Sequence, residues 1–370
     1  MRKSLLIAAM AGLAIVGCTE NELDQSVKSQ QAISFSVPVL SNTTKANVYG
    51  ELKNPYDKLE HFSVYAMYHE GDYVSSTAST NLATYFANVD AAYDDAADVK
   101  GWSTGKGSGN KYYYWPKKEG AKLTFAAYSP TGLTGTIGWT AASGFTLTGF
   151  TVADVTSGQY DLMFTKREKN QTASTGGTNY AGVDMNFEHA LSSIVFTAKK
   201  DAEYTGTTVK LKKITLLNVY SKGSYTQGLK DDASNVCQNG YPCWGNWDTE
   251  KDYVVYENAG AELTTSAVNK NDNDVILIPQ AFKHSASSEI KVKIDYSIKT
   301  ETGAEIEQTN TVSLVTGNNG GYFTDGTNNI EGWAIGKRYT YNIVFSFDKI
   351  YFSPEVTDWA DVTALGGVTF

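Results

Sequence analysis

Apolar and polar side chains alternate with a period of two in long stretches of this 370-residue chain, and no other feature constrains its fold so strongly. Residues 33–39 and 290–298 show the alternation most clearly. Successive side chains of a strand point to opposite faces of a sheet, so the pattern predicts strands with one buried and one solvated face. No long helical pattern appears in the sequence.

Shorter apolar runs lie between clusters of Gly, Asn, Asp and Ser, which favour turns. These runs cover residues 62–67, 123–128, 194–198, 214–219, 275–278 and 341–347. Many short strands without alternating helices predict an all-β fold of packed antiparallel sheets, that is, β-sandwiches. At this length we expect two sandwich domains in tandem, over residues 32–175 and 176–370. The boundary is placed in the polar, glycine-rich segment 166–182.

The first 17 residues have the composition of a secretory signal peptide. Arg2 and Lys3 precede an apolar stretch over residues 5–16, which is too short to span a membrane. Cys18 follows a small residue at the site where lipoprotein signals are cut. We expect residues 1–17 to be removed, Cys18 to carry two or three acyl chains, and the polar residues 18–31 to form a flexible tether. A buried N-terminal helix is the alternative.

Charge and cysteine usage agree with export to an oxidising compartment. The formal net charge is −9, which argues against binding to a phosphate backbone and predicts no nucleic-acid partner. Besides Cys18, only Cys237 and Cys243 are present. We predict one disulfide between them, because the loop that they bracket contains the turn formers Asn239-Gly240 and Pro242. A metal pair or a redox pair is the alternative, although the spacing is not CxxC.

Residue patterns of known catalytic and metal sites are missing. The four histidines, among them His189, lack the HExxH spacing, and no GxSxG elbow or phosphate loop is present. We predict no enzyme activity, no catalytic residue, no metal site and no cofactor, and interpret His189 as a packing or hydrogen-bonding residue. Residues 269–274 are faintly similar to a calcium loop, but an Asx-rich turn is preferred because the Gly and the final acid are absent.

Several segments, in this order and behind a lipoprotein signal, resemble the fimbrillin-like subunits of type V pili of anaerobic Gram-negative bacteria. The resemblance is carried in the first half by FSVYA (62–66), YYWP (113–116), LTFAAYSP (123–130) and DLMF (161–164). In the second half it is carried by FEHALS (187–192), LIPQ (277–280) and WAIGKRYTY (333–341).

The resemblance implies a structural subunit with two transthyretin-like antiparallel β-sandwich domains in tandem. It also implies a surface-exposed outer-membrane lipoprotein that becomes part of an adhesive pilus. The implied partners are other pilin subunits in a homo- or hetero-polymer, a maturation protease that cuts after Arg or Lys, the lipid of the outer membrane, and host or bacterial surface ligands. In similar proteins the protease removes the first strand, and a C-terminal strand of a neighbour fills the groove.

The first strand of this chain suits that scheme. Its apolar side chains are Ile33, Phe35, Val37 and Val39, and Pro38 favours an edge or an irregular point of pairing because it has no N–H. The polar loop that follows contains Lys45, and small polar loops are where proteases cut. We predict cleavage between Lys45 and Ala46. The alternative is a permanent first strand and an ordinary surface lysine.

The C-terminal tail is the candidate donor strand. Its apolar residues are Val356, Val362, Leu365, Val368 and Phe370. The alternation over residues 341–347 slips near residues 348–349, which indicates a bulge or a strand break. The tail can equally stay on its own domain, in which case the chain is a tip or accessory subunit.

A surface glycan-binding lipoprotein is the rival function. Trp244 and Trp247, in a Gly- and Asn-rich stretch, are its candidate stacking platforms. Aromatic residues are also common in the cores of β-sandwiches, which favours the structural role.

Overall fold

The computed structural model describes residues 31–37, 61–73, 82–94, 101–140, 144–173, 182–202, 206–227, 243–270, 274–315, 323–325, 328–346 and 350–359. These residues form strands β1 to β22 and a 3₁₀ turn at Thr156–Gly158, and none of them lies in an α-helix. Within these ranges no helix has the length and apolar character needed to cross a bilayer. The all-β prediction is confirmed.

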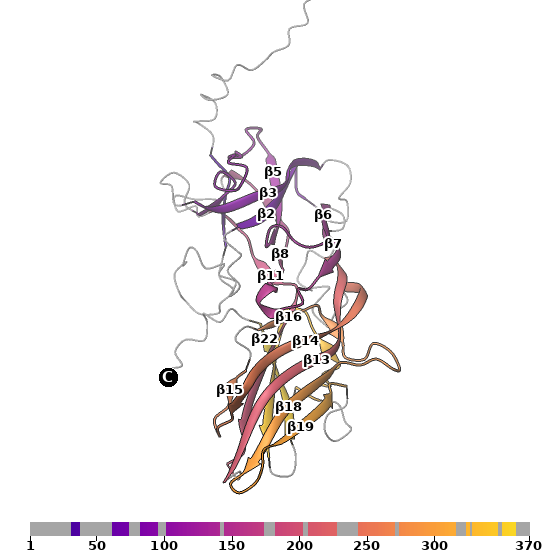
Figure 1. Ribbon diagram of the computed structural model, residues 1–370. Helices are drawn as coiled ribbons and strands as arrows, with labels where there is room; N and C mark the ends of the chain where they lie inside the picture. The colour runs from indigo at the N-terminus through magenta and orange to yellow at the C-terminus, as the bar shows by residue number, and fades with distance from the viewer. Residues whose placement is uncertain are drawn as a thin grey trace, which may run out of the picture.

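The first half of the chain builds a nine-stranded sheet, called here the N-terminal sheet, at one end of the molecule (Figure 1). Its strand order is β10-β1-β4-β3-β2-β5-β8-β11, with β9 also paired to β5. The bounds are β1 (Ser34–Ser36), β2 (His61–Glu70), β3 (Ala83–Asp94), β4 (Gly101–Ser103), β5 (Ala121–Ser129), β8 (Met163–Thr165), β9 (Glu168–Gln171), β10 (Val183–Asp184) and β11 (Phe187–His189).

The other described strands form two further sheets and one strand pair. The long sheet has the order β19-β18-β13-β7-β6, with β14 along β13, and comprises β6 (Thr136–Thr140), β7 (Gly144–Thr151), β13 (Thr207–Thr226), β14 (Trp244–Glu262), β18 (Lys291–Thr300) and β19 (Ile306–Ser313). The C-terminal sheet has the order β15-β12-β21-β22, with β16 also on β12, and comprises β12 (Ser192–Lys200), β15 (Val268–Asn269), β16 (Val275–Leu277), β21 (Lys337–Phe345) and β22 (Ile350–Asp358). The pair is β17 (Gln280–Ala281) with β20 (Gly332–Trp333).

Each apolar run of the sequence coincides with a strand, namely β2, β5, β12, β13, β16 or β21, although the runs 275–278 and 341–347 continue past the ends of β16 and β21. Two strand pairs differ from the antiparallel expectation, because β1 runs parallel to β10 and β12 runs parallel to β21. Parallel partners need a long connection, and both pairs join segments far apart in sequence. Local periodicity carries no information about such pairings.

Strand β5 is buried on both faces and separates two apolar clusters. Leu123, Phe125 and Ala127 face the cluster around β1, whereas Ala126 and Tyr128 face the cluster that continues into the long and C-terminal sheets. This burial explains why the run over residues 123–128 is apolar without alternation. One face of the N-terminal sheet therefore packs against the long and C-terminal sheets, and its other face lies in the cluster that contains β1.

Pairing crosses the expected domain boundary in both directions. The hairpin of β6 and β7 adds to β13 in the long sheet, while β10 and β11 belong to the N-terminal sheet. Strand β9 lies within the segment 166–182 and pairs with β5. The sequence showed no periodicity there, because a polar strand at the margin of a sheet needs no apolar pattern. The division into domains 32–175 and 176–370 stays a prediction.

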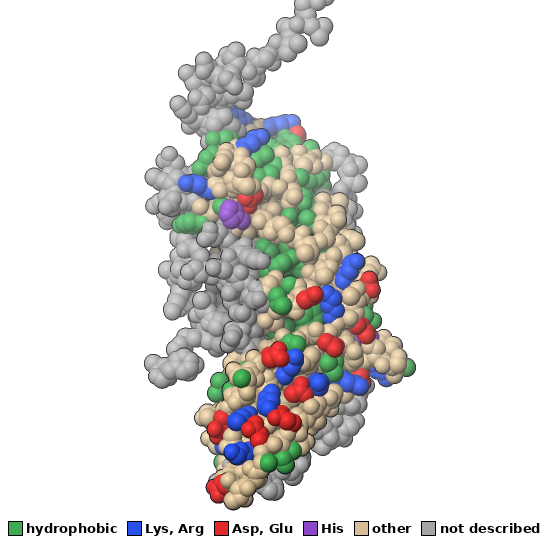
Figure 2. Space-filling model, viewed as in Figure 1, with side chains coloured by type: hydrophobic (Ala, Val, Ile, Leu, Met, Phe, Trp, Pro, Cys, Tyr) green, Lys and Arg blue, Asp and Glu red, His purple; other side chains and the backbone are tan. Residues whose placement is uncertain are grey.

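Charges of both signs are interleaved over the face of the long sheet that Figure 2 presents. Lys210 Nζ lies 3.1 Å from Glu305 Oε2, and Lys213 Nζ lies 3.1 Å from Glu257 Oε1. Exposed pairs of this kind contribute about 0–1 kcal/mol each. Their value lies in solubility and in the protection of edge strands such as β19, where Glu307 is paired with Lys212.

Candidate functional site

Strand β1 is the predicted removable strand, and the structure holds it between two neighbours. It pairs antiparallel with β4 and parallel with β10. Ile33 N donates to Tyr113 O at 2.8 Å just before the strand, and Met185 N donates to Ser36 O at 2.7 Å at its end. The segments that hold β1 are called the β1 slot and comprise residues 102–103, 113–115 and 182–185.

The described part of this strand does not lie at the edge of its sheet. The outer side of Phe35 and Ser36 is covered by the two-residue strand β10. Strand β10 lies about 150 positions later in the sequence than β1, so no pattern near β1 predicts this pairing. Pro38, which is expected to lie at an edge or at an irregular point of pairing, and Val39 lie outside the described residues, so that expectation stays a prediction.

Aromatic rings enclose Phe35 in the slot. Phe35 has no exposed surface, and its ring centroid lies 5.7 Å from that of Phe62 and 5.5 Å from that of Phe125 in edge-on arrangements. Ile33 is 1% exposed, and Val37 packs at the margin of the same cluster. Each fully buried side chain of this size stabilises the fold by about 1.5–3 kcal/mol. Ile33 and Phe35 therefore anchor β1.

Gly182 allows β10 to approach the backbone of β1. Its φ is +112°, and a Cβ at this position would lie 2.5 Å from both N and C of Phe35. Such a distance cannot be relieved by a side-chain rotation, because the opposing atoms are backbone. A residue larger than glycine at position 182 therefore forces β10 away from β1.

Polar residues line the outer wall of the slot. Ser36 Oγ donates to Asp184 Oδ1, and Asn186 Nδ2 donates to Glu168 Oε1 at 3.1 Å. Burial raises the pKa of the Glu168 carboxyl above its ordinary value of 4.5, and nearby Asp184 raises it further. The hydrogen bonds from Asn186 and the charge of Lys166 act in the opposite direction.

Replacing Glu168 with glutamine is expected to raise the melting temperature near neutral pH. The folded protein binds the Glu168 proton more tightly than the unfolded chain, so wild-type stability falls as the pH rises from 4.5 through the raised pKa. Glutamine keeps the acceptor for Asn186 and carries no charge. The gain in melting temperature should vanish below pH 4.5, where both states are protonated.

The matched control is Glu119→Gln, which removes one negative charge from an exposed position. Thermal unfolding from pH 4 to pH 8 should give a pH-dependent gain for Glu168→Gln alone. An equal gain for both variants, or none for Glu168→Gln, would contradict the assigned burial of the carboxylate.

Several predicted site residues lie outside the described residues, so nothing structural is said of them: Cys18, Val39, Lys45, Ala46, Cys237, Val362, Leu365, Val368 and Phe370. Cys243 is buried and disulfide-bonded. Its pairing with Cys237 stays a prediction.

Among the strands that the structure describes, β22 pairs with β21 and comes last in the order of the C-terminal sheet. Val356, the described member of the candidate donor, is half-buried opposite Tyr339. Phe345 at the end of β21 pairs with Ile350 at the start of the antiparallel strand β22, whereas residues 348–349, where a bulge or a strand break is expected, lie outside the described residues. In this structure β22 is intramolecular.

The end of β22 contacts the N-terminal sheet through a histidine. His189 Nδ1 lies 2.6 Å from Asp161 Oδ2, and both side chains are buried. The Trp359 ring stacks on His189 with 4.1 Å between centroids and 10° between planes, and Trp359 N donates to Gly336 O at 3.0 Å. The interpretation of His189 as a packing and hydrogen-bonding residue is confirmed.

Replacing His189 with alanine is expected to lower the free energy of unfolding by about 1–3 kcal/mol, because Asp161 loses a buried partner. Asp161 Oδ1 is already buried without a hydrogen bond, so no second contact compensates. A double-mutant cycle with Trp359→Ala in urea unfolding should give about 0.5–1.5 kcal/mol of coupling from the stack. The control pair, His61→Ala with Trp359→Ala, should be additive, and additivity of the His189 pair would refute the stacking contact.

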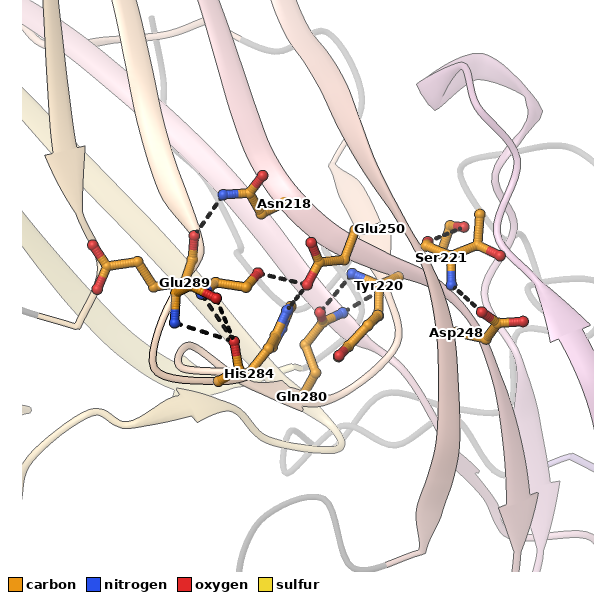
Figure 3. Close-up of polar contacts among 12 residues, drawn as sticks. Asn218, Tyr220, Ser221, Asp248, Glu250, Gln280, His284 and Glu289 are labelled. Carbon is orange, nitrogen blue, oxygen red and sulfur yellow. Dashed lines mark hydrogen bonds and ion pairs between the residues drawn. The ribbon is translucent and has the colours of Figure 1, made fainter.

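A polar cluster fastens the loop after β17 to β13 and β14 (Figure 3). His284 Nδ1 lies 2.9 Å from Glu250 Oε1, and Ser288 Oγ donates to the same oxygen at 2.6 Å. The His284 ring stacks on Tyr220, whose backbone N–H and C=O both bond the Gln280 amide. The Ser288 hydroxyl bonds Glu250 and not the His284 ring, so the cluster lacks the pairing that activates a nucleophile. Its role is structural.

The predicted stacking platforms are mostly buried. Trp244 is 2% exposed and its Nε1 donates to Ala190 O at 2.7 Å, so the expectation of an exposed Trp244 is wrong. Trp247 is half-buried and donates through Nε1 to Pro279 O at 3.1 Å. These rings are buried because packed β-sheets are stabilised by the burial of large aromatic side chains.

In the described part of the segment 269–274, the carboxylate of Asp274 is bonded by other side chains of the protein. Asp274 Oδ2 accepts from Ser193 Oγ at 2.5 Å, and Asp274 Oδ1 accepts from Arg338 Nη2 at 3.1 Å. Among the residues the structure describes, no group of three or more His, Cys, Asp and Glu is placed to hold a metal ion.

Sequence reasoning missed the outer wall of the slot. A signal was present, because Val183, Met185 and Phe187 alternate with polar residues directly after Gly182. All three of these apolar side chains are buried in the β1 cluster.

Comparison with known proteins gives a family and a shared fold. The sequence matches the fimbrillin-like family over residues 44–359, and no curated protein matches it. A fimbrial protein from Bacteroides vulgatus has a TM-score of 0.58 at 18% identity, with 89% of this chain and 99% of that chain covered. At this identity the likeness shows a common fold.

Two further solved structures are less similar. A candidate cell adhesion protein from Bacteroides uniformis has a TM-score of 0.45 at 15% identity, covering 89% of this chain and 98% of that one. The tip fimbrial protein Mfa3 from Porphyromonas gingivalis, truncated at its C-terminus, has a TM-score of 0.35 at 12% identity, covering 82% and 96%. The family match spans most of the sequence, and the chain therefore belongs to the fimbrillin-like family.

Proposed function

We propose that this protein is a structural subunit of a surface pilus that matures by loss of β1 and assembles by strand exchange. In this scheme it is exported as a lipoprotein through Cys18, cut between Lys45 and Ala46, and completed by a strand of a neighbouring subunit. The resulting polymer serves adhesion. The family assignment supports the structural, non-catalytic role.

The observation that carries the proposal is the setting of β1. The strand is buried among aromatic rings and paired on both sides, yet it precedes the rest of its sheet in the sequence. A cut anywhere between β1 and β2 frees it while every other strand stays covalently joined. The vacated slot would expose apolar rings and unpaired backbone groups, and strand addition satisfies both at once.

In vitro assembly tests the proposal. The purified full-length chain is treated with a lysine-specific protease and analysed by electrophoresis without boiling, where exchanged strands give a ladder of detergent-resistant oligomers. Lys53 and Lys58 also lie between β1 and β2, so both are first replaced with alanine. This double variant should assemble like the wild type, and adding Lys45→Ala to it should leave the protein monomeric. Assembly of the triple variant at the wild-type rate would contradict cleavage at Lys45, and no oligomers from any variant would contradict strand exchange.

Membrane attachment is tested separately. Cys18→Ala should shift the protein from the membrane fraction to the soluble fraction of the producing cell, because two or more acyl chains are needed for stable anchoring. Unchanged fractionation would contradict lipidation at Cys18.

A further inference from the structure

Residues 182–189, called here the strap, join the two ends of the strand order in the N-terminal sheet. They contain β10 and β11, which are separated by Met185 and Asn186 alone but stand at opposite ends of that order. The apolar side chains of the strap, Val183, Met185 and Phe187, are buried in the β1 cluster. Strand β1 is therefore enclosed by a sheet that the strap closes.

The two edges of β1 face different walls of the slot. Strands β4 and β10 lie on opposite sides of β1 in the strand order. Ile33 N donates to Tyr113 O, and Met185 N donates to Ser36 O. Residues three apart in a strand point their backbone groups toward opposite edges. Residues 113–115 and β4 therefore hold one edge of β1, and the strap holds the other.

The strap is the less firmly held of these two walls. Among the described strands, β4 pairs with both β1 and β3, whereas β10 pairs with β1 alone. The opposite wall is also fastened through Tyr85, whose Oη donates to Tyr114 O at 2.5 Å. Loss of β1 thus removes the strand pairing of β10 and leaves that of β4 with β3 intact.

The far end of the strap is anchored independently of β1. Strand β11 pairs with β8 over three residues, and Ala190 N donates to Leu162 O at 2.7 Å. His189 is held by the Asp161 carboxylate and by the stacked Trp359 ring. None of these contacts involves β1, so residues 187–189 can serve as the fixed end of a hinge.

A polar contact fastens the strap between its two ends. Asn186 Nδ2 donates to Glu168 Oε1 at 3.1 Å, and Glu168 belongs to β9, which pairs with β5. No atom of β1 takes part in this hydrogen bond. It therefore restrains the strap whether or not β1 is in place.

We infer that the strap is a gate: residues 182–186 swing outward about residues 187–189 to release β1, and the hydrogen bond between Asn186 and Glu168 is its latch. Sideways release first breaks the two-residue pairing of β1 with β10. Lengthwise withdrawal would instead pull the buried side chains of Ile33 and Phe35 through a closely packed core. The inference rests on the proposed function, and it names the part of the subunit that moves when a strand leaves or enters.

Release of β1 from the cut protein tests the gate. A site-specific protease sequence is inserted after Ala46 of the full-length chain, the N-terminus is labelled with a fluorophore, and the folded protein is cut. An excess of unlabelled peptide covering residues 31–40 then blocks rebinding, and the fall in fluorescence polarisation gives the release rate. The latch variant is Asn186→Ala. The matched control is Tyr85→Phe, which removes a hydrogen bond from the opposite wall.

The expected result is faster release in the latch variant alone. Asn186→Ala should speed release by about threefold to tenfold, as follows from the loss of one hydrogen bond that restrains the moving wall. Tyr85→Phe should leave the release rate unchanged, because the wall that it loosens does not move.

Hydrogen exchange of the uncut full-length chain locates the hinge. In Asn186→Ala the amide of Met185, which bonds Ser36 O, should exchange faster than in the wild type. The amide of Ala190, which bonds Leu162 O beyond the fixed end, should keep its exchange rate. Equal acceleration at both amides would overturn the hinge at residues 187–189.

Failure of the gate is distinct from failure of the proposed function. Equal release rates in all three proteins, equal acceleration by both variants, or acceleration by Tyr85→Phe alone would overturn the gate while leaving strand exchange intact. If β1 never left any of the cut proteins, both the gate and the proposed strand exchange would be overturned.

Discussion

Replacing Phe35 with alanine is expected to lower the free energy of unfolding of the N-terminal sheet by about 3–5 kcal/mol. The side chain is fully buried, and its ring contacts Phe62 and Phe125 edge-on. Alanine loses the transfer free energy of the ring and leaves a cavity between two aromatic side chains that cannot collapse freely. Urea unfolding followed by tryptophan fluorescence measures the change, since Trp102 lies 5.3 Å from Phe62 between ring centroids.

Phe86→Ala is the matched control for Phe35→Ala. Phe86 belongs to the same cluster but lies on β3, which no cleavage would remove. Both variants should be less stable than the wild type. After cleavage between β1 and β2, only Phe35→Ala should release the strand faster, and equal release rates would contradict the assignment of Phe35 as the anchor of β1.

Replacing Gly182 with alanine is expected to cost about 2–6 kcal/mol, as the sum of two penalties of roughly 1–3 kcal/mol each. One penalty arises from the positive φ of +112°, and the other from a Cβ placed 2.5 Å from backbone atoms of Phe35. Separation of β10 from β1 relieves the clash, so the amides that join these strands should also exchange with solvent faster. Hydrogen exchange and urea unfolding together measure both effects.

Two other glycines serve as controls that separate the cost of the positive φ from the cost of the close backbone contact. Gly71→Ala meets a positive φ of +77° with no atom within 4 Å of the new Cβ, and Gly109→Ala meets neither penalty. The loss of stability should therefore rank Gly182 above Gly71 above Gly109. If Gly182→Ala cost no more than Gly71→Ala, the close approach of β10 to β1 would be wrong.

The sequence predicted the strands better than their neighbours. Alternation over residues 33–39 located β1, and the apolar run at residues 123–128 located β5. Both patterns depend on a single strand. Pairing depends on which distant segment arrives beside it, and nothing near Phe35 indicates β10.

The candidate site was predictable to the same extent as the fold: its strand could be found from the sequence, and the neighbours of that strand could not. Ile33 and Phe35 were identified as apolar members of a strand that a partner could replace, because burial follows from hydrophobicity and period. The role of Gly182 was not predictable, since close backbone approach is a property of two segments. Trp244 was assigned to the surface from its polar surroundings in sequence. It is buried in the core instead, because large aromatic side chains stabilise sheet packing.

Mass spectrometry of the N-terminus of the protein sheared from intact cells tests the central claim most directly. The form left in the membrane fraction is measured alongside. Loss of β1 before assembly predicts that the sheared form begins at Ala46 and lacks residues 31–37, while the membrane fraction retains a lipidated Cys18. Sheared protein that still carries residues 31–37 in every subunit would contradict the claim, because the β1 slot would then never open to a neighbour.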